Sequence, residues 1–368
     1  MKNSVITPKL VHKDSAEDVL VRQPRPALPL QIEKSTADQW VQAGLGCLLE
    51  LYKPHEQNGD LLRLALANSN QGLTSLFDRT IPLDPAWEPY RALPYQIIEA
   101  EFSASHAGVL QQLENFYANA NKTEHPIAEL FRSTSYKMIN QADHYFFYRK
   151  DHEHVPGTML IEAQRQAVYT HVYTMTQHVR GDVTVSLDKL YCNFYGYVDL
   201  MYPLELVVDD MQEERDARAK KITYRVALFQ RSKLIAIIDS VVNIIDMNQF
   251  KRFRNLFLYE KNDHPYVPIQ ADKVQCRLVD AENKEYPAEC VSISRDRCMT
   301  TYHNVAIDDI RSIKIHSNGL VFSSAIEPEY RSQKNAVWRF PHLSQEQLMD
   351  MGGIIKRGFI LQNYEVYQ

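Results

Sequence analysis

The sequence has few of the features that mark secreted, metal-binding and membrane proteins. Its 368 residues include five cysteines, an odd number with no CxxC spacing, which argues against a disulfide framework or a structural zinc site and favours a reducing cytoplasm. No apolar run is long enough for a signal peptide or a membrane span. The 13 histidines include no HExxH motif, so we expect no bound metal ion, and no motif indicates a cofactor.

A strong positive charge is also missing. The formal net charge is -5, which argues against a nucleic-acid-binding protein. Hydrophobic residues make up 45% of the chain and charged residues 24%, the usual balance of globular domains. The length suffices for two or three such domains, each with its own core.

The most informative segment runs from residue 151 to residue 167. A turn at Pro156 and Gly157 leads into a predicted helix that is apolar over most of its circumference. Such a helix is normally wrapped by other structure, and a charge buried with it must be paired or put to use. Four polar side chains nevertheless share one face of this helix, namely Glu162, Arg165, Gln166 and Tyr169.

The geometry of this helix suits chemistry on a carbonyl group. The first N–H groups of a helix lack intrahelical partners, and after Pro156 and Gly157 they can approach the carbonyl oxygen of a thioester closely. Glu162 is placed to act as a base, while Arg165 can orient it or bind a phosphate. The alternative is structural: Glu162 and Arg165 form an ordinary ion pair and Gln166 ties the helix to a strand.

The stretch HVPGTMLIEAQRQA, from His154 to Ala167, resembles the helix signature of AfsA-type A-factor biosynthesis proteins, approximately DHVPGMxLLEAxRQA. It is more distantly similar to the helix of the FabA and FabZ acyl-carrier-protein dehydratases. The resemblance implies an α+β hotdog fold, in which an antiparallel sheet wraps round a central helix. It also implies binding of acyl chains on coenzyme A or acyl carrier protein, and Glu162, Arg165 and His154 as catalytic positions.

The reaction that the resemblance implies joins a β-ketoacyl thioester to dihydroxyacetone phosphate, giving butyrolactone-type signals. AfsA-type chains usually carry two hotdog repeats, whereas only one EAxRQ stands here, so a homodimer is implied. The dehydratase histidine lies in a longer loop than the one before Pro156. His152 and His154 are both open to the simpler reading that they cap the turn.

Strand patterns flank the helix as this fold requires. Upstream, 132–150 alternates loosely, and downstream, runs follow between residues 183 and 245, the last of which suits a central strand. The charged stretch 209–221 predicts a solvated hairpin loop. We expect the ligand pocket to be lined by Pro156, Gly157, Gln166 and Asn193, with Tyr195 and Asp199 as further candidates.

The N-terminal third predicts helices. Residues 1–34 are polar and punctuated by prolines, which favours a flexible arm. A helix is expected over 39–52, and further helices over 59–78 and 106–121. A strand over 96–103, followed by the last of these helices, leaves open a degenerate first hotdog.

The C-terminal third predicts short strands that weakly resemble the β-barrel of PilZ domains. These domains bind cyclic di-GMP through RxxxR and [D/N]xSxxG motifs. The loop here keeps Ser294 but has Arg297 for the glycine, and Arg252 belongs to a basic run that only approximates RxxxR. These three residues are the candidate nucleotide ligands, and we expect cyclic di-GMP binding to be weak or absent.

The sequence therefore predicts a cytoplasmic acyl-thioester-binding hotdog protein, acyltransferase-like if it is an enzyme. The alternative is a non-catalytic acyl-ligand sensor or scaffold with a regulatory PilZ-like domain. The predicted segments are a flexible arm at 1–34, a mainly helical region at 35–130, the hotdog domain at 131–250, the barrel at 265–345 and a C-terminal tail at 346–368.

Overall fold

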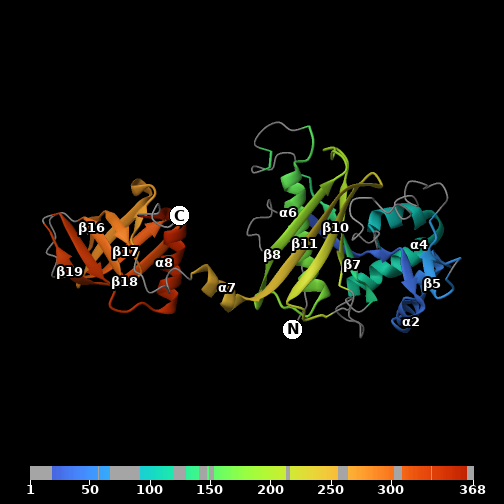
Figure 1. Ribbon diagram of the computed structural model, residues 1–368, viewed down its shortest axis with the longest axis horizontal. Helices are drawn as coiled ribbons and strands as arrows, with labels where there is room; N and C mark the ends of the chain where they lie inside the picture. Colours follow the sequence, from blue (N-terminus) through green and yellow to red (C-terminus); the bar gives the residue numbers. More distant parts are fainter. Residues whose placement is uncertain are drawn as a thin grey trace. The chain divides into compact units, whose positions relative to one another are not determined.

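The computed structural model describes residues 19–56, 58–66, 92–119, 130–140, 147–148, 153–212, 216–255, 264–301, 309–332 and 334–362. The chain divides into two compact units, residues 1–247 and residues 248–368 (Figure 1). No helix in the described residues is both long and apolar enough to cross a membrane.

The first unit contains one large sheet, one helix against it and an outer layer of helices and short strands. Its elements in chain order are β1 (Val21–Pro26), β2 (Leu28–Pro29), β3 (Gln31–Glu33), α2 (Lys34–Gln42), the 3-10 helix η2 (Gly46–Leu51), β4 (Tyr52–Pro54), β5 (Leu61–Leu64), β6 (Ala92–Leu93), α4 (Tyr95–Asn119), β7 (Ser133–Met138), α6 (Gly157–Met175), β8 (Val183–Phe194), β9 (Leu204–Asp210), β10 (Lys221–Gln230) and β11 (Lys233–Asp246).

The large sheet has the strand order β1-β7-β9-β10-β11-β8, and every neighbouring pair is antiparallel. Figure 1 shows α6 lying along one face of these long strands. A long antiparallel sheet round one helix is the hotdog fold, so this part of the prediction is confirmed. The expected central strand over 234–245 is β11, which lies between β10 and β8.

Side chains alternate along each strand, so the central strands of the sheet contribute to a core on each of its two faces. On β10, Tyr224, Val226 and Leu228 pack in the same core cluster as α6, on what we call the inner face. Ala227 and Phe229 point the other way, to the outer face, and join the core of the N-terminal layer. The sheet is therefore sandwiched between α6 and the N-terminal layer.

The N-terminal layer differs from its prediction in three places. The expected flexible arm forms β1, β2 and β3 over its last residues, while residues 1–18 lie outside the described part. The expected helix over 59–78 is wrong at its start, which is β5. The expected strand over 96–103 is part of α4, so the degenerate first hotdog built on that strand is not present there.

Trp40 explains why this layer folds against the sheet. Its side chain is fully buried, packs on Tyr52 and Phe131, and donates a 3.0 Å hydrogen bond from Nε1 to the Leu130 carbonyl. The chain reverses at Gly44, whose φ of 77° suits glycine, and this ends the helix that was expected to continue to residue 52.

The stretch 209–221 was expected to be a solvated loop, and this is wrong at its start. Asp209 and Asp210 are the last residues of β9, and both are buried. Ser133 donates a short hydrogen bond to the Asp209 carboxylate, and the Asp210 carboxylate accepts one of 3.0 Å from the Gln212 N–H. The charged residues predicted exposure to solvent, but these two carboxylates can be buried because they accept hydrogen bonds inside the fold.

The second unit begins within α7 (Met247–Arg254) and forms two antiparallel sheets round one core, with α8 packed in that core. The expected C-terminal tail is wrong for 346–362, because that stretch forms most of α8 and then β21, which pairs with β12. The PilZ likeness stays a prediction. Its remaining elements are β12 (Tyr266–Pro268), η5 (Ala271–Lys273), β13 (Val274–Asp280), β14 (Glu285–Ala288), β15 (Cys290–Ile293), β16 (Arg297–Thr301), β17 (Ile310–Ser317), β18 (Leu320–Ala325), β19 (Glu327–Arg331), β20 (Asn335–Arg339), α8 (Gln345–Gly358) and β21 (Phe359–Leu361).

Glu205 joins the sheet to the N-terminal layer. Its carboxylate accepts a 3.1 Å hydrogen bond from the N–H of Gln96, in the first turn of α4. Burial raises the pKa of Glu205 to about 8, although this N–H acts to lower it. The folded protein therefore holds the proton of Glu205 more tightly than the unfolded chain does.

We predict that Glu205→Gln makes the first unit less sensitive to alkaline pH. Because the folded pKa exceeds the unfolded value, the stability due to protonated Glu205 is full below about pH 4.5 and is lost as pH rises through about 8. Each unit of pKa difference corresponds to about 1.4 kcal/mol. Calorimetric melting from pH 5 to pH 9 should show a shallower decline in Glu205→Gln than in the wild type, while exposed Glu50→Gln should follow the wild type. Equal slopes for Glu205→Gln and the wild type would contradict the prediction.

Candidate functional site

The N-terminus of α6 is fixed by the loop that follows β8. The Val155 N–H donates a 2.9 Å hydrogen bond to the Val198 carbonyl, and His154 forms a β-bridge with Asp199. Pro156 caps the helix with an extended backbone. The N–H groups of Gly157 and Thr158 have no acceptor within the described part of the chain, so they are available to a ligand.

Gly157 lies beside the end of β8. A Cβ atom placed there would lie 3.6 Å from the ring of Phe194, an ordinary van der Waals distance, so the first turn of α6 is next to this ring. Farther along, the Tyr169 hydroxyl donates to the Val185 carbonyl and the Tyr173 hydroxyl to the Val183 carbonyl. Helix α6 therefore runs alongside β8 in the opposite direction, with residues 162–165 level with the middle of the strand.

Glu162 and Arg165 form a two-pronged ion pair on the flank of α6. The guanidinium donates from Nε to Glu162 Oε2 at 2.7 Å and from Nη2 to Oε1 at 2.8 Å. Burial acts to lower the pKa of Arg165, but the Glu162 carboxylate raises it above its usual value, so the guanidinium stays charged. The Glu162 side chain is 18% exposed and that of Arg165 is 37% exposed, so the pair is accessible from solvent.

Gln166 holds this pair in place. Its Nε2 donates a 3.0 Å hydrogen bond to Glu162 Oε1, and its Oε1 accepts one of 2.9 Å from the Leu20 N–H just before β1. Arg165 also lies over the ring of Tyr169, which is one turn farther along α6, at 5.5 Å from the ring centroid. Gln166 therefore ties α6 to the chain beside β1, and Glu162 and Arg165 form the ion pair that their spacing predicted. Both features were expected under the structural alternative.

An apolar strip of β8 lies beside the pair. The inner-face residues Leu190 and Cys192 pack against the α6 core, while Leu187 and Phe194 remain 53% and 47% exposed. We call Leu187, Leu190, Cys192 and Phe194 the β8 strip. It extends from the free N–H groups at the start of α6 along the side of the helix that carries Glu162 and Arg165.

His154 lies at the same end of α6 and contacts neighbours that the sequence did not pair with it. Its ring stacks on Tyr197, with centroids 4.9 Å apart, and its buried Nδ1 lies 3.8 Å from Asp199 Oδ1. Gln230 fixes Asp199 by accepting from its N–H at 2.9 Å and donating to its carbonyl at 2.8 Å. Asp199 is distant in sequence from His154, and no spacing pattern indicated the contact.

Asn193 lies apart from the other expected pocket residues. It pairs with Ile237 in the sheet, and Ile237 packs in the core of the N-terminal layer. Its neighbour Cys192 pairs with Ile238 and faces α6. Strand alternation therefore places Asn193 on the outer face, because one residue along β8 reverses the side that a side chain faces.

Two of the three candidate nucleotide ligands of the second unit, Ser294 and Arg297, are engaged with protein groups. The Arg297 N–H donates to Ser294 Oγ at 3.2 Å, and the Arg297 guanidinium donates to Glu329 from Nε at 2.7 Å and from Nη2 at 3.1 Å. The carboxylate neutralises the charge that a phosphate would need. Arg252 lies on the exposed surface of α7. In the described residues no group of three His, Cys, Asp or Glu side chains is placed to hold a metal ion.

The comparisons with known proteins agree with the fold. Residues 127–246, about a third of the chain, match the family described as AfsA, A-factor biosynthesis hotdog domain. That segment contains β7, α6 and the strands from β8 to β11. No curated protein sequence matches the chain.

Several solved structures are similar to about a third of this chain, at low sequence identity. A thioesterase from Haemophilus influenzae is 8% identical, covering 32% of this chain and 73% of its own, with a TM-score of 0.26. The PaaI protein of the E. coli phenylacetic acid degradation operon is 10% identical, with 31% and 72% covered and a TM-score of 0.25. AziG from S. sahachiroi is 10% identical, with 32% and 86% covered and a TM-score of 0.26. The fold assignment rests on the strand order and the family match.

We predict that Glu162→Gln lowers stability less than Gln164→Ala does. Water can solvate the partly exposed Arg165 when its partner is neutral, so the loss should stay below about 1 kcal/mol. Gln164 is buried on the same helix and donates a 3.1 Å hydrogen bond to Ser240, and its removal should cost about 1–3 kcal/mol. Calorimetric melting of the two variants measures the difference, and a larger loss in Glu162→Gln would make the ion pair a structural device.

Proposed function

We propose that the first unit binds an acyl thioester between α6 and the β8 strip, and that Glu162 and Arg165 act on it. The observation that carries the proposal is the position of this ion pair. It is partly open to solvent, it lies beside apolar side chains that are about half exposed, and it follows a helix start with free N–H groups. The family match supports the proposal, because the AfsA resemblance implies function at these two positions.

The proposed chemistry is acyl transfer to a small phosphorylated alcohol. The hydroxyl oxygen of the alcohol attacks the thioester carbonyl carbon, the new C–O bond forms and the C–S bond breaks. The N–H groups of Gly157 and Thr158 stabilise the developing oxyanion. Glu162 or His154 accepts the hydroxyl proton and returns it to the departing thiolate, so that an ester and a thiol leave.

Arg165 has a role in binding as well as in charge balance. Its side chain is 37% exposed and its guanidinium stays charged beside Glu162, so a phosphate of the second substrate can approach it from solvent. We therefore assign the phosphate to Arg165. The acyl chain occupies the β8 strip, where its apolar surface replaces water.

The proposed protein is a homodimer formed through β8. Within the described residues this strand pairs with β11 and, apart from a single bridge between Val183 and Arg180, most of its outer edge has no strand partner, which is a template for a second copy. Joining two such edges about a two-fold axis would extend the sheet and cover the exposed part of the β8 strip. Each pocket would then be closed by the partner chain.

We predict that Leu187→Asp yields a monomer. Leu187 is half exposed in the single chain, so the substitution should leave the fold intact, but a carboxylate at the joined edge would be desolvated. Light scattering at micromolar concentration should give twice 42.7 kDa for the wild type and 42.7 kDa for Leu187→Asp. Val321→Asp, at a similarly exposed residue of the second unit, should behave as the wild type. A monomeric wild type would refute the dimer.

The function is tested with a β-ketooctanoyl pantetheine thioester and dihydroxyacetone phosphate. We expect thiol release that requires both compounds, is abolished in Glu162→Gln, and in Arg165→Ala shows a larger rise in KM for the phosphate compound than for the thioester. Gln347→Ala, in the second unit, serves as the control. If calorimetry detects no thioester binding by the wild type, the proposal fails.

The second candidate function is a non-catalytic sensor or scaffold that binds the same ligand. It is favoured by the hydrogen bonds of Glu162, because both carboxylate oxygens already accept donors from Arg165 and Gln166. These donors occupy the oxygen lone pairs that a general base would use to take up a proton. Tight binding of the thioester without thiol release in any combination would select this function.

A further inference from the structure

The turn between β10 and β11 carries two cations in an uncommon setting. It is a two-residue turn of Arg231 and Ser232, with φ values of 52° and 60°. Asn and Gly are the usual residues in such a turn, because other side chains are strained at positive φ. Lys233 follows at the start of β11, and both cationic side chains are exposed.

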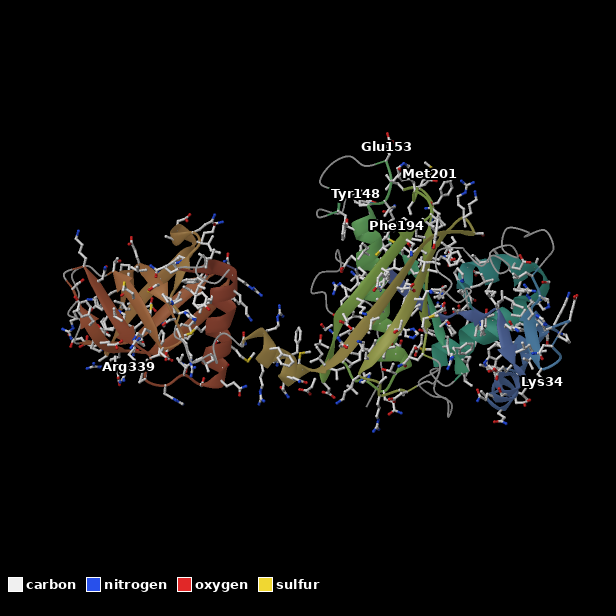
Figure 2. The ribbon with its side chains drawn as sticks, in the orientation of Figure 1. Lys34, Tyr148, Glu153, Phe194, Met201 and Arg339 are labelled. Carbon is white, nitrogen blue, oxygen red and sulfur yellow. The ribbon has the colours of Figure 1, made fainter. Side chains whose placement is uncertain are left out.

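This turn lies at the end of the unit where α6 begins. Gln230, the last residue of β10, binds the backbone of Asp199, which in turn bridges to His154. On β11, Ala236 pairs with Phe194, whose ring lies against Gly157. Three residues of strand, about 10 Å, therefore separate Lys233 from the level of the α6 N-terminus. Figure 2 shows Phe194, Met201 and Glu153 at this same end.

The two cations are not neutralised by the described part of the protein. Arg231 lies over the ring of Tyr202, 4.6 Å from its centroid, and neither Arg231 nor Lys233 has a carboxylate partner among the described residues. Two exposed lysines elsewhere in the unit do have one: Lys34 pairs with Asp60 at 3.1 Å and Lys221 with Asp188 at 2.8 Å. The turn thus presents two positive charges beside aromatic surface.

We propose that Arg231 and Lys233 bind the phosphate groups of coenzyme A and thereby select it as the carrier of the acyl chain. This inference rests on the proposed function, since it places the far end of the same thioester. The acyl group lies along α6, the extended pantetheine arm passes the start of the helix, and the nucleotide reaches the turn. A guanidinium and an ammonium together match the multiple charges of the coenzyme A phosphates.

The surroundings favour a nucleotide over a carrier protein. A protein partner would bury about 800 Å² of this surface. Such a footprint would take in the carboxylates at the same end, Asp199 beside His154 and the exposed Glu153, which repel an acidic carrier protein. The phosphates of coenzyme A need only the turn and its flanking aromatic surface.

The experiment compares two ligands that differ only in the nucleotide. Calorimetry measures the dissociation constants of S-octyl-coenzyme A and S-octyl-pantetheine, thioethers that cannot be hydrolysed, with the full chain at low and high salt. The variants are Arg231→Gln with Lys233→Gln, the charge-conserving Arg231→Lys, and Lys34→Gln as a control in the N-terminal layer. We expect the wild type to bind the coenzyme A compound at least about tenfold more tightly, a difference of about 1.4 kcal/mol.

The double variant should lose this preference and bind S-octyl-pantetheine as the wild type does, whereas Arg231→Lys should retain most of it and Lys34→Gln all of it. Salt should weaken only the coenzyme A compound. Equal affinity of the wild type for both compounds, or an unchanged preference in the double variant, would overturn the inference while leaving the proposed function intact. If the wild type binds neither compound, the proposed function fails and the inference with it.

Discussion

The burial of α6 is the constraint on which the rest of the first unit depends. The helix is apolar over most of its surface, and only a long sheet curved along its length can cover that much area. Alternation along the strands then makes the outer face apolar too, as Val207, Ala227 and Phe229 show, so a second layer is needed. The helices round Trp40 supply it. The proposed pocket is placed where this covering stops, on the flank of α6 beside β8.

Polar contacts decide which flank of α6 stays open. Gln164 binds Ser240 of β11 and Gln166 binds the backbone at Leu20, and these two hydrogen bonds, made in different directions from one turn, fix the rotation of the helix. With that rotation, Arg165 lies over Tyr169, whose hydroxyl donates to the Val185 carbonyl of β8, so the Arg165 end of the ion pair lies towards β8. Apolar burial alone would tolerate several rotations, because nearly every side of the helix is apolar, so the orientation of the ion pair depends on a few buried amides.

The sequence predicted those features that depend on local pattern. The helical offsets brought Glu162, Arg165 and Gln166 together, and the alternation from residue 183 to 245 predicted the strands on which the site rests. The sequence-based predictions were wrong where contacts between distant parts of the chain determine the structure. Asn193 was placed in the pocket although one step of alternation turns it outward, and 96–103 was assigned to a strand although its apolar residues pack as a helix against η2 and the sheet. The contact of His154 with Asp199 depends on how a loop folds back, which periodicity does not encode.

The two edges of the large sheet differ, and this difference determines where a second copy can join. At one edge, β1 contains Pro24 and Pro26, which lack N–H groups, and its register with β7 is interrupted between Arg22 and Arg25. Prolines and irregularities of this kind protect an edge strand from pairing. At the other edge, β8 has twelve residues without proline, and its register with β11 shifts once, between Leu187 and Lys189. The absence of proline favours β8 as the edge for the proposed dimer, in which the candidate site and the assembly would share one surface.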